Sequence, residues 1–142
     1  MAAACDRWVE QPPAARCQTE DMALHITADD AADDLLTRDP LALLIGMLLD
    51  QQVAMETAFA GPLKIEQRIG SLDAATIAGF DPAAFVNAFK MPPAVHRFPG
   101  SMAERVQGLC RAVEQDWGGD AAALWTAGDP SGAEVLKRLR AL

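Results

Sequence analysis

The stretch from Leu41 to Gln52, LALLIGMLLDQQ, decides the fold that this sequence predicts. Its first nine residues are all apolar or glycine, and Asp39-Pro40 before them is a typical helix start, with a capping carboxylate and a proline in the first turn. A helix that is apolar on every side must be buried among other helices. We therefore expect a central buried helix whose polar end, Asp50-Gln51-Gln52, reaches the surface.

The flanking sequence predicts further helices and no strand. Asp81-Pro82 and Asp129-Pro130 repeat the same helix start, and Ser101 with Glu104 forms a capping-box pattern before an apolar stripe. No stretch alternates between polar and apolar residues as a strand does. Other helices are expected at residues 28–36, 53–60, 63–69, 74–78, 83–90, 121–125 and 132–142. The predicted fold class is all-α, a multi-helix orthogonal bundle around one buried central helix.

Domain organisation follows from the same patterns. Residues 1–21 show no helical or strand period and contain Pro12-Pro13, so a flexible N-terminal tail is expected there. Residues 22–142 are expected to form one α-helical domain, because a chain of 142 residues suits a single core.

Composition limits the classes of protein. The three cysteines and two histidines are widely spaced, which favours free thiols over disulfides or a metal site, and no cofactor is expected. The apolar run at 41–49 is far shorter than the roughly 20 residues of a membrane span, and the N-terminus lacks the order of a signal peptide. We expect no membrane partner and a cytoplasmic location.

Charge is unevenly distributed along the chain. The net charge of −8 argues against a general affinity for nucleic acid. Residues 1–50 carry a net −7, however, whereas residues 61–111 carry a net +2. The middle of the chain could therefore face a phosphate backbone, although scattered charges on helix surfaces are the simpler interpretation.

Two polar segments could carry chemistry. The first is the helix end at Asp50-Gln51-Gln52, whose simpler interpretation is a polar terminus that bonds its own backbone. The second is the segment 91–100, MPPAVHRFPG, which is stiffened by prolines and includes His96 and Arg97. Its simpler interpretation places Val95 and Phe98 at the core edge, with His96 and Arg97 solvated.

Two motifs resemble a known superfamily. Leu48 to Val53, LLDQQV, after a buried apolar helix resembles the opening helices of the helix-hairpin-helix GPD superfamily of DNA glycosylases, which includes endonuclease III. The stretch 100–106, GSMAERV, resembles the second marker of that superfamily, a small-Ser-x-Ala turn that opens a helix. The resemblance covers residues 22–142 and implies base-excision repair, in which the N-glycosidic bond of a damaged base is hydrolysed.

The resemblance also implies a partner and its contacts. The partner is double-stranded DNA that contains a damaged base, and Gln52 matches the side chain that enters the duplex where the base is flipped out, with Gln51 beside it. Base extrusion costs a few kcal/mol, and a carboxamide can both donate to and accept from the orphaned base. The segment with His96 and Arg97 matches a second probing loop, and Ser101 completes the candidate DNA-binding residues.

The superfamily's catalytic parts cannot be assigned to any residue here. Its glycine-rich hairpin would begin where this sequence stops, at Arg140 to Leu142, and neither the hairpin nor the catalytic aspartate that follows it is found. Residues 22–142 are therefore expected to form a glycosylase-like domain that is C-terminally incomplete, with the lesion-probing part present and the catalytic segment missing. A non-catalytic α-helical module that binds DNA or a repair partner, or a helical scaffold with shared patterning, are the alternatives. An absent hairpin would leave Leu136 and Leu139 uncovered, which favours self-association through the last helix.

Overall fold

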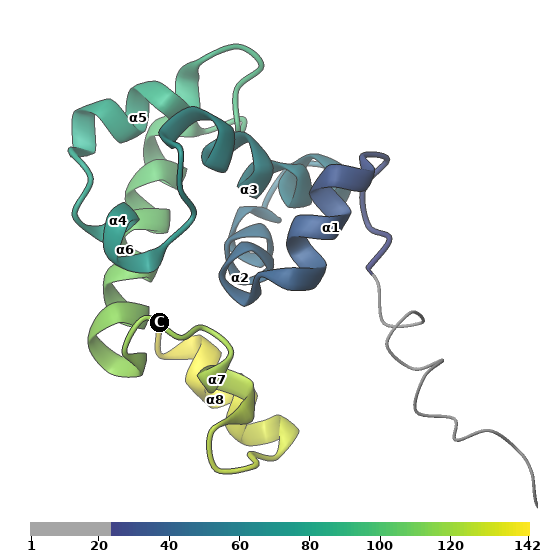
Figure 1. Ribbon diagram of the computed structural model, residues 1–142, viewed down its shortest axis with the longest axis vertical. Coiled ribbons are helices and arrows are strands. Elements are labelled where there is room, and N and C mark those ends of the chain that lie inside the picture. The colour runs from purple at the N-terminus through teal and green to yellow at the C-terminus, as the bar shows by residue number, and fades with distance from the viewer. Residues whose placement is uncertain (1–23) are drawn as a thin grey trace, which may run out of the picture.

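The computed structural model describes residues 24–142, which form helices and no strand, and the predicted all-α class is confirmed (Figure 1). The predicted tail at residues 1–21 lies outside the described residues. Within the described part no helix is long and apolar enough to cross a bilayer. The helices are α1 (Asp30–Arg38), α2 (Pro40–Leu49), α3 (Met55–Ile69), α4 (Ala74–Ala78), α5 (Pro82–Lys90), α6 (Pro99–Trp117), α7 (Ala123–Thr126) and α8 (Gly132–Arg140).

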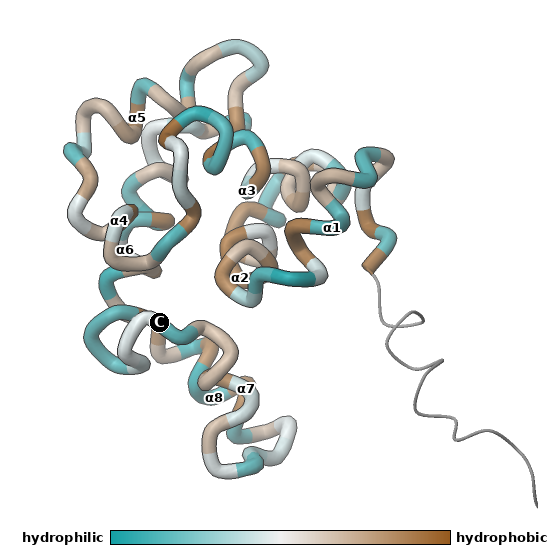
Figure 2. The backbone as a smooth tube through the Cα atoms, viewed as in Figure 1, coloured by the Kyte–Doolittle hydropathy of each residue, from teal (hydrophilic) through white to brown (hydrophobic). Residues whose placement is uncertain are grey.

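Helix α2 begins as the sequence predicts and lies in the core. The Asp39 side chain accepts a hydrogen bond from the Leu41 backbone N–H at 3.0 Å. Ile45 and Leu49 are fully buried, and the α2 tube is largely brown in Figure 2, which marks apolar residues. The expectation that no face of this helix meets solvent is wrong at Met47, which is 46% exposed. One side of α2 thus remains open.

Two glycines bring α2 and α3 close together. A Cβ atom on Gly46 would lie 2.5 Å from the ring of Phe59 in α3, and one on Gly61 would lie 2.6 Å from the Leu49 side chain in α2. Each helix therefore offers a glycine to a large side chain of the other. This reciprocal contact fixes the position of the α2 C-terminus, which carries the candidate site.

Helix α3 is longer than the sequence predicts. The two helices expected at 53–60 and 63–69 form a single helix from Met55 to Ile69, with Pro62 inside it. A proline costs an interior helix one hydrogen bond, and here Pro62 is buried against the core, which compensates for that loss. The helix ends at Gly70, whose φ of 82° is left-handed.

Two predicted helix starts are wrong. Helix α6 begins at Pro99, with Phe98 as its N-cap, so Ser101 lies inside the first turn and forms no capping box. Helix α8 begins at Gly132, where the Ser131 hydroxyl accepts from the Glu134 N–H at 3.3 Å, and Asp129 is not its cap. The start at Asp81-Pro82 is confirmed by the bond from the Ala84 N–H to the Asp81 carboxylate at 3.0 Å.

The helices pack in two groups, which contact one another through α3 with α5 and through α2 with α6. Figure 1 shows α1 to α3 on one side, α4 to α6 on the other, and the α7–α8 hairpin at one end. The Arg138 guanidinium holds this hairpin, donating to the Leu124 carbonyl at 3.2 Å and the Ala127 carbonyl at 2.9 Å. Leu136 of α8 is 48% exposed and Leu139 is half-buried.

Candidate functional site

The turn after α2 has a strained backbone at an exposed glutamine. Asp50 ends the helix by donating its N–H to the Gly46 carbonyl at 3.1 Å, and the Gln51 N–H bonds the Leu49 carbonyl at 2.7 Å. Gln52 then adopts a φ of 61°. This left-handed conformation costs a residue with a side chain about 1 kcal/mol, and such residues are enriched at binding sites. The Gln52 side chain is exposed and makes no hydrogen bond to the described residues.

His96 joins this turn to the 91–98 loop. Its ring is 2% exposed, and its Nε2 atom lies 3.0 Å from the Leu49 carbonyl oxygen and 2.9 Å from the Gln51 carbonyl oxygen. Its Nδ1 atom accepts the Phe98 backbone N–H at 3.0 Å. Because Nδ1 is an acceptor, the proton sits on Nε2 and is shared between the two carbonyls. The neutral ring therefore fixes both segments to one another.

The 91–98 loop is held at several further points. Val95 is fully buried, and its N–H donates to the Phe89 carbonyl at 3.0 Å. The Arg68 guanidinium donates to the Ala88 carbonyl at 2.8 Å and also to the Pro93 carbonyl. The loop is thus anchored to α3, α5 and the α2 turn before it reaches Arg97.

Arg97 and Phe98 extend from this anchored loop into solvent. Phe98 is 42% exposed, and the Arg97 guanidinium carbon lies 5.4 Å from the centre of the Phe98 ring. The simpler interpretation of this loop was right for Val95. It was wrong for Phe98, which is not at the core edge, and for His96, which is not solvated.

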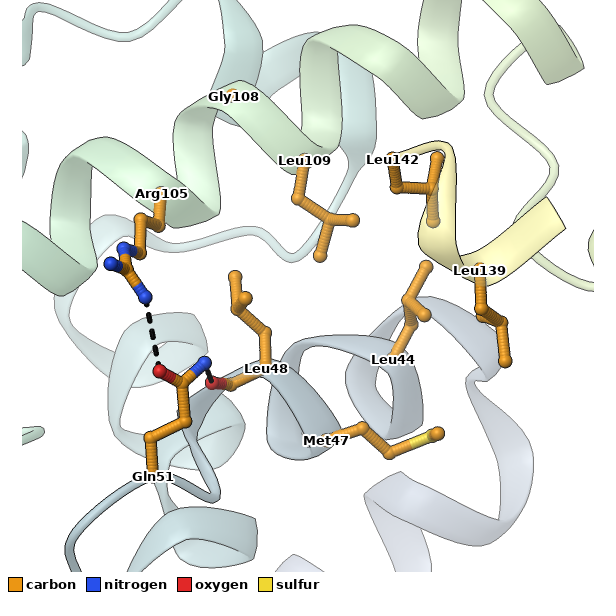
Figure 3. Close-up of a pocket in the computed structure, with 9 residues that line it drawn as sticks. All are labelled: Leu44, Met47, Leu48, Gln51, Arg105, Gly108, Leu109, Leu139 and Leu142. Carbon is orange, nitrogen blue, oxygen red and sulfur yellow. Dashed lines mark hydrogen bonds between the residues drawn. The ribbon is translucent and has the colours of Figure 1, made fainter. Parts of the chain in front are cut away.

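Arg105 is a site residue that sequence reasoning missed. Its guanidinium donates to the Gln51 side-chain oxygen at 3.0 Å, and the Gln51 side-chain nitrogen donates to the Leu48 carbonyl at 2.9 Å (Figure 3). Both ends of the Gln51 carboxamide are therefore bonded within the protein. The sequence feature that could have identified Arg105 as a site residue is its spacing of four residues from Ser101, which puts both on one face of α6.

The five candidate residues lie on three connected segments. Gln51 and Gln52 occupy the α2 turn, His96 and Arg97 occupy the loop bound to it, and exposed Ser101 lies in the first turn of α6, which follows that loop. Among them, Gln52, Arg97 and Ser101 are exposed, whereas His96 is internal. The buried His96 side chain thus lies beneath the segments that carry the exposed candidate residues.

The local charge differs from that of the whole chain. Residues 90–111 carry four basic side chains against a single acid, Glu104. The neighbouring carboxylate of Asp50 is exposed at the α2 turn. The first turn of α6 has no side-chain cap and no acidic residue, so its positive helix end is not neutralised there.

The described residues offer no metal site and no activated thiol. No group of three histidine, cysteine, aspartate or glutamate side chains between residues 24 and 142 could hold a metal ion. Burial, and to a lesser extent the charge of Asp73, raises the pKa of the Cys110 thiol to about 12. Cys110 is therefore protonated at neutral pH, and its thiol is no nucleophile.

Comparisons of this chain with family models, curated proteins and solved structures gave no match in any of the three.

Proposed function

We propose that this chain recognises a damaged base in double-stranded DNA, as a DNA glycosylase-like protein of base-excision repair that acts in the cytoplasm. The proposal includes the orthogonal bundle of the helix-hairpin-helix GPD type. Hydrolysis of the N-glycosidic bond would need a phosphate-binding hairpin and a catalytic aspartate, and none of the described residues is assigned to either. Recognition is therefore the part of the reaction that this chain's residues can perform.

One observation carries the proposal. The His96 Nε2 atom binds the backbone carbonyls of Leu49 and Gln51, at 3.0 and 2.9 Å, and so joins the two segments that the resemblance selects for probing DNA. These segments lie about 45 positions apart in the sequence. A support of this kind is useful where two loops must approach the same ligand in a fixed geometry.

Gln52 is the candidate for insertion into the duplex. Its side chain is exposed and makes no hydrogen bond to the described residues. The Gln51 carboxamide, in contrast, is hydrogen-bonded to the Leu48 carbonyl and to Arg105. A free carboxamide can fill the space of an extruded base and pair with the orphaned base on the other strand. The strained backbone at Gln52 keeps this side chain on a tight turn.

Arg97, Ser101 and the α6 N-terminus supply groups that suit phosphates. Both side chains are exposed, and the first α6 turn presents backbone N–H groups and contains no acidic residue. Phosphate contacts position a protein on DNA and make its affinity depend on salt. The overall charge of −8 opposes binding, so the affinity should depend on this local basic region.

A non-catalytic module that binds DNA remains the second candidate. It is favoured by the exposed Asp50, which is the carboxylate nearest the candidate residues in sequence and which has no salt-bridge partner among the described residues. A lone, solvated carboxylate is poorly suited to acid–base work. A preference for duplexes that contain a damaged or missing base distinguishes the candidates, because a general DNA-binding module would bind intact and damaged duplexes equally.

The test is a binding measurement on two duplexes, one intact and one with a stable abasic analogue. We expect tighter binding to the abasic duplex and a linear fall of log affinity with log salt. Gln52→Ala should lower the ratio of the affinities for the abasic and intact duplexes about tenfold. Gln115→Ala, at an exposed position on α6, should leave this ratio unchanged. Equal losses on both duplexes would exclude Gln52 from insertion.

A further inference from the structure

An apolar groove with a volume of about 500 Å³ lies between α2 and α6 (Figure 3). Six aliphatic side chains line it, and Arg105 carries the one charged side chain among the lining residues. Figure 3 shows Arg105 and Gln51 at one end of the groove and Leu139 and Leu142 at the other. The aliphatic lining consists of Leu44, Met47, Leu48, Leu109, Leu139 and Leu142. Small-molecule sites have this size and composition, with a few polar groups in an apolar wall.

Gly108 leaves space in this groove, although the packing of the fold does not require a glycine there. It lies inside α6, where glycine costs about 1 kcal/mol relative to alanine. A Cβ atom on Gly108 would meet no atom within 4 Å, whereas one on Gly46 would lie 2.5 Å from Phe59. Gly46 is thus required by packing, and Gly108 is not. Its missing side chain instead keeps the groove open alongside α6.

Arg105 has donors left for a ligand. One of its N–H groups bonds the Gln51 side-chain oxygen, and a guanidinium has five such groups. The salt bridges among residues 24–142 involve Arg38 and Arg138, and none involves Arg105. A cation without a carboxylate partner is complementary to an anionic head group.

We propose that this groove binds a small amphipathic carboxylic acid. The carboxylate lies on the Arg105 guanidinium, and the aliphatic body follows the leucine wall across Gly108. Apolar contact supplies most of the affinity, and the charged end fixes the orientation of the ligand. The groove shares Gln51 with the candidate DNA-binding turn, but the inference does not depend on the proposed function.

The test is isothermal titration of the full chain with decanoate at neutral pH. We expect saturable binding of one decanoate per chain, at least tenfold tighter than that of decylamine, which has the same body and the opposite charge. Arg105→Gln should weaken decanoate binding about tenfold, because a hydrogen bond to a charged group is lost. Arg111→Gln, at an exposed arginine of α6 outside the groove, should leave it unchanged.

Substitutions at Gly108 test the space in the groove. Gly108→Leu should abolish decanoate binding, and Gly108→Ala should weaken it while raising the thermal stability. If the leucine variant does not fold, the alanine variant and Arg105→Gln carry the test. The inference is overturned by equal affinity for decanoate and decylamine, by no saturable binding, or by unchanged binding in both Gly108→Ala and Arg105→Gln. Sedimentation that shows a second copy filling the groove, as a dimer that Gly108→Leu converts to monomer, would also overturn it.

Discussion

The ring of His96 hydrogen-bonds the carbonyl of Leu49, a residue 47 positions earlier in the chain, at 3.0 Å. The same Nε2 atom lies 2.9 Å from the Gln51 carbonyl, and Nδ1 accepts the Phe98 N–H. One buried side chain therefore satisfies three backbone groups from two segments.

We predict that His96→Ala lowers the free energy of unfolding by about 2–4 kcal/mol. The loss combines unsatisfied buried carbonyls with a cavity in the core. Urea denaturation of the variant and the wild type measures it. Arg97→Ala, at the exposed neighbouring position, should change stability by less than about 0.5 kcal/mol. Similar values for both variants would show that the His96 bonds contribute no net stability.

The limits of prediction from this sequence are clearest at the helix starts. Asp39-Pro40 and Asp81-Pro82 were predicted correctly because their capping bonds join residues two or three apart. The Ser101 capping box failed because helix α6 begins two residues earlier, at Pro99. The Phe98 N–H is taken by the His96 ring, and Phe98 becomes the N-cap.

The sequence predicted which segments form the candidate site, but not the contacts between them. Local composition identified the polar turn and the 91–100 loop, and Gln52 and Arg97 are exposed there as expected. Local composition could not indicate that His96 is buried, because its partners are 45 and 47 positions away. The Arg105 bond to Gln51 spans 54 positions and escaped prediction for the same reason.

The backbone at Gln52 yields a prediction about strain. With φ at 61°, glycine is favoured over any residue with a Cβ atom. Gln52→Gly should therefore be more stable than Gln52→Ala by about 1 kcal/mol, measured by urea denaturation. The order should reverse at Ala112 inside α6, where Ala112→Gly should cost about 1 kcal/mol. If Gln52→Ala were the more stable variant, the left-handed turn would not persist in solution.

The two helical glycines Gly46 and Gly108 yield opposite predictions for the same substitution. Gly46→Ala should destabilise the protein by about 1–3 kcal/mol, because its Cβ would overlap the buried Phe59 ring at 2.5 Å. Gly108→Ala should stabilise it by about 1 kcal/mol, because no atom lies within 4 Å. Thermal unfolding of the two variants gives the comparison. A Gly46→Ala variant at least as stable as the wild type would contradict the packing of α2 on α3.

Asp33 gives the stability a dependence on pH. The Thr27 backbone N–H bonds its carboxylate at 2.8 Å and, with further bonds from the Thr27 hydroxyl and the Ile26 N–H, lowers the pKa against the opposing effect of burial. A lowered pKa stabilises the fold above the ordinary aspartate value of about 4, and this contribution is lost as the pH falls through the folded-state pKa.

We therefore expect Asp33→Asn to be less stable than the wild type at pH 7, with a difference that shrinks as the pH falls below about 4. Urea denaturation at a series of pH values measures it. Asp116→Asn, at an exposed position near the end of α6, serves as the control and should show no such convergence. A difference that is constant between pH 7 and pH 3 would show that the Asp33 charge has no role.

Leu136 of α8 yields a prediction about association. It is 48% exposed on a helix with no buried residue, so part of the apolar face of α8 is uncovered. We expect the protein to self-associate as its concentration rises, because contact between two such faces removes apolar surface from water. Sedimentation equilibrium measures this, and Leu136→Gln should shift the population towards monomer. Met55→Gln removes an equally exposed apolar side chain from α3 and should have no effect. A wild-type protein that stays monomeric at millimolar concentration, or an equal response to both substitutions, would show that α8 is not the contact surface.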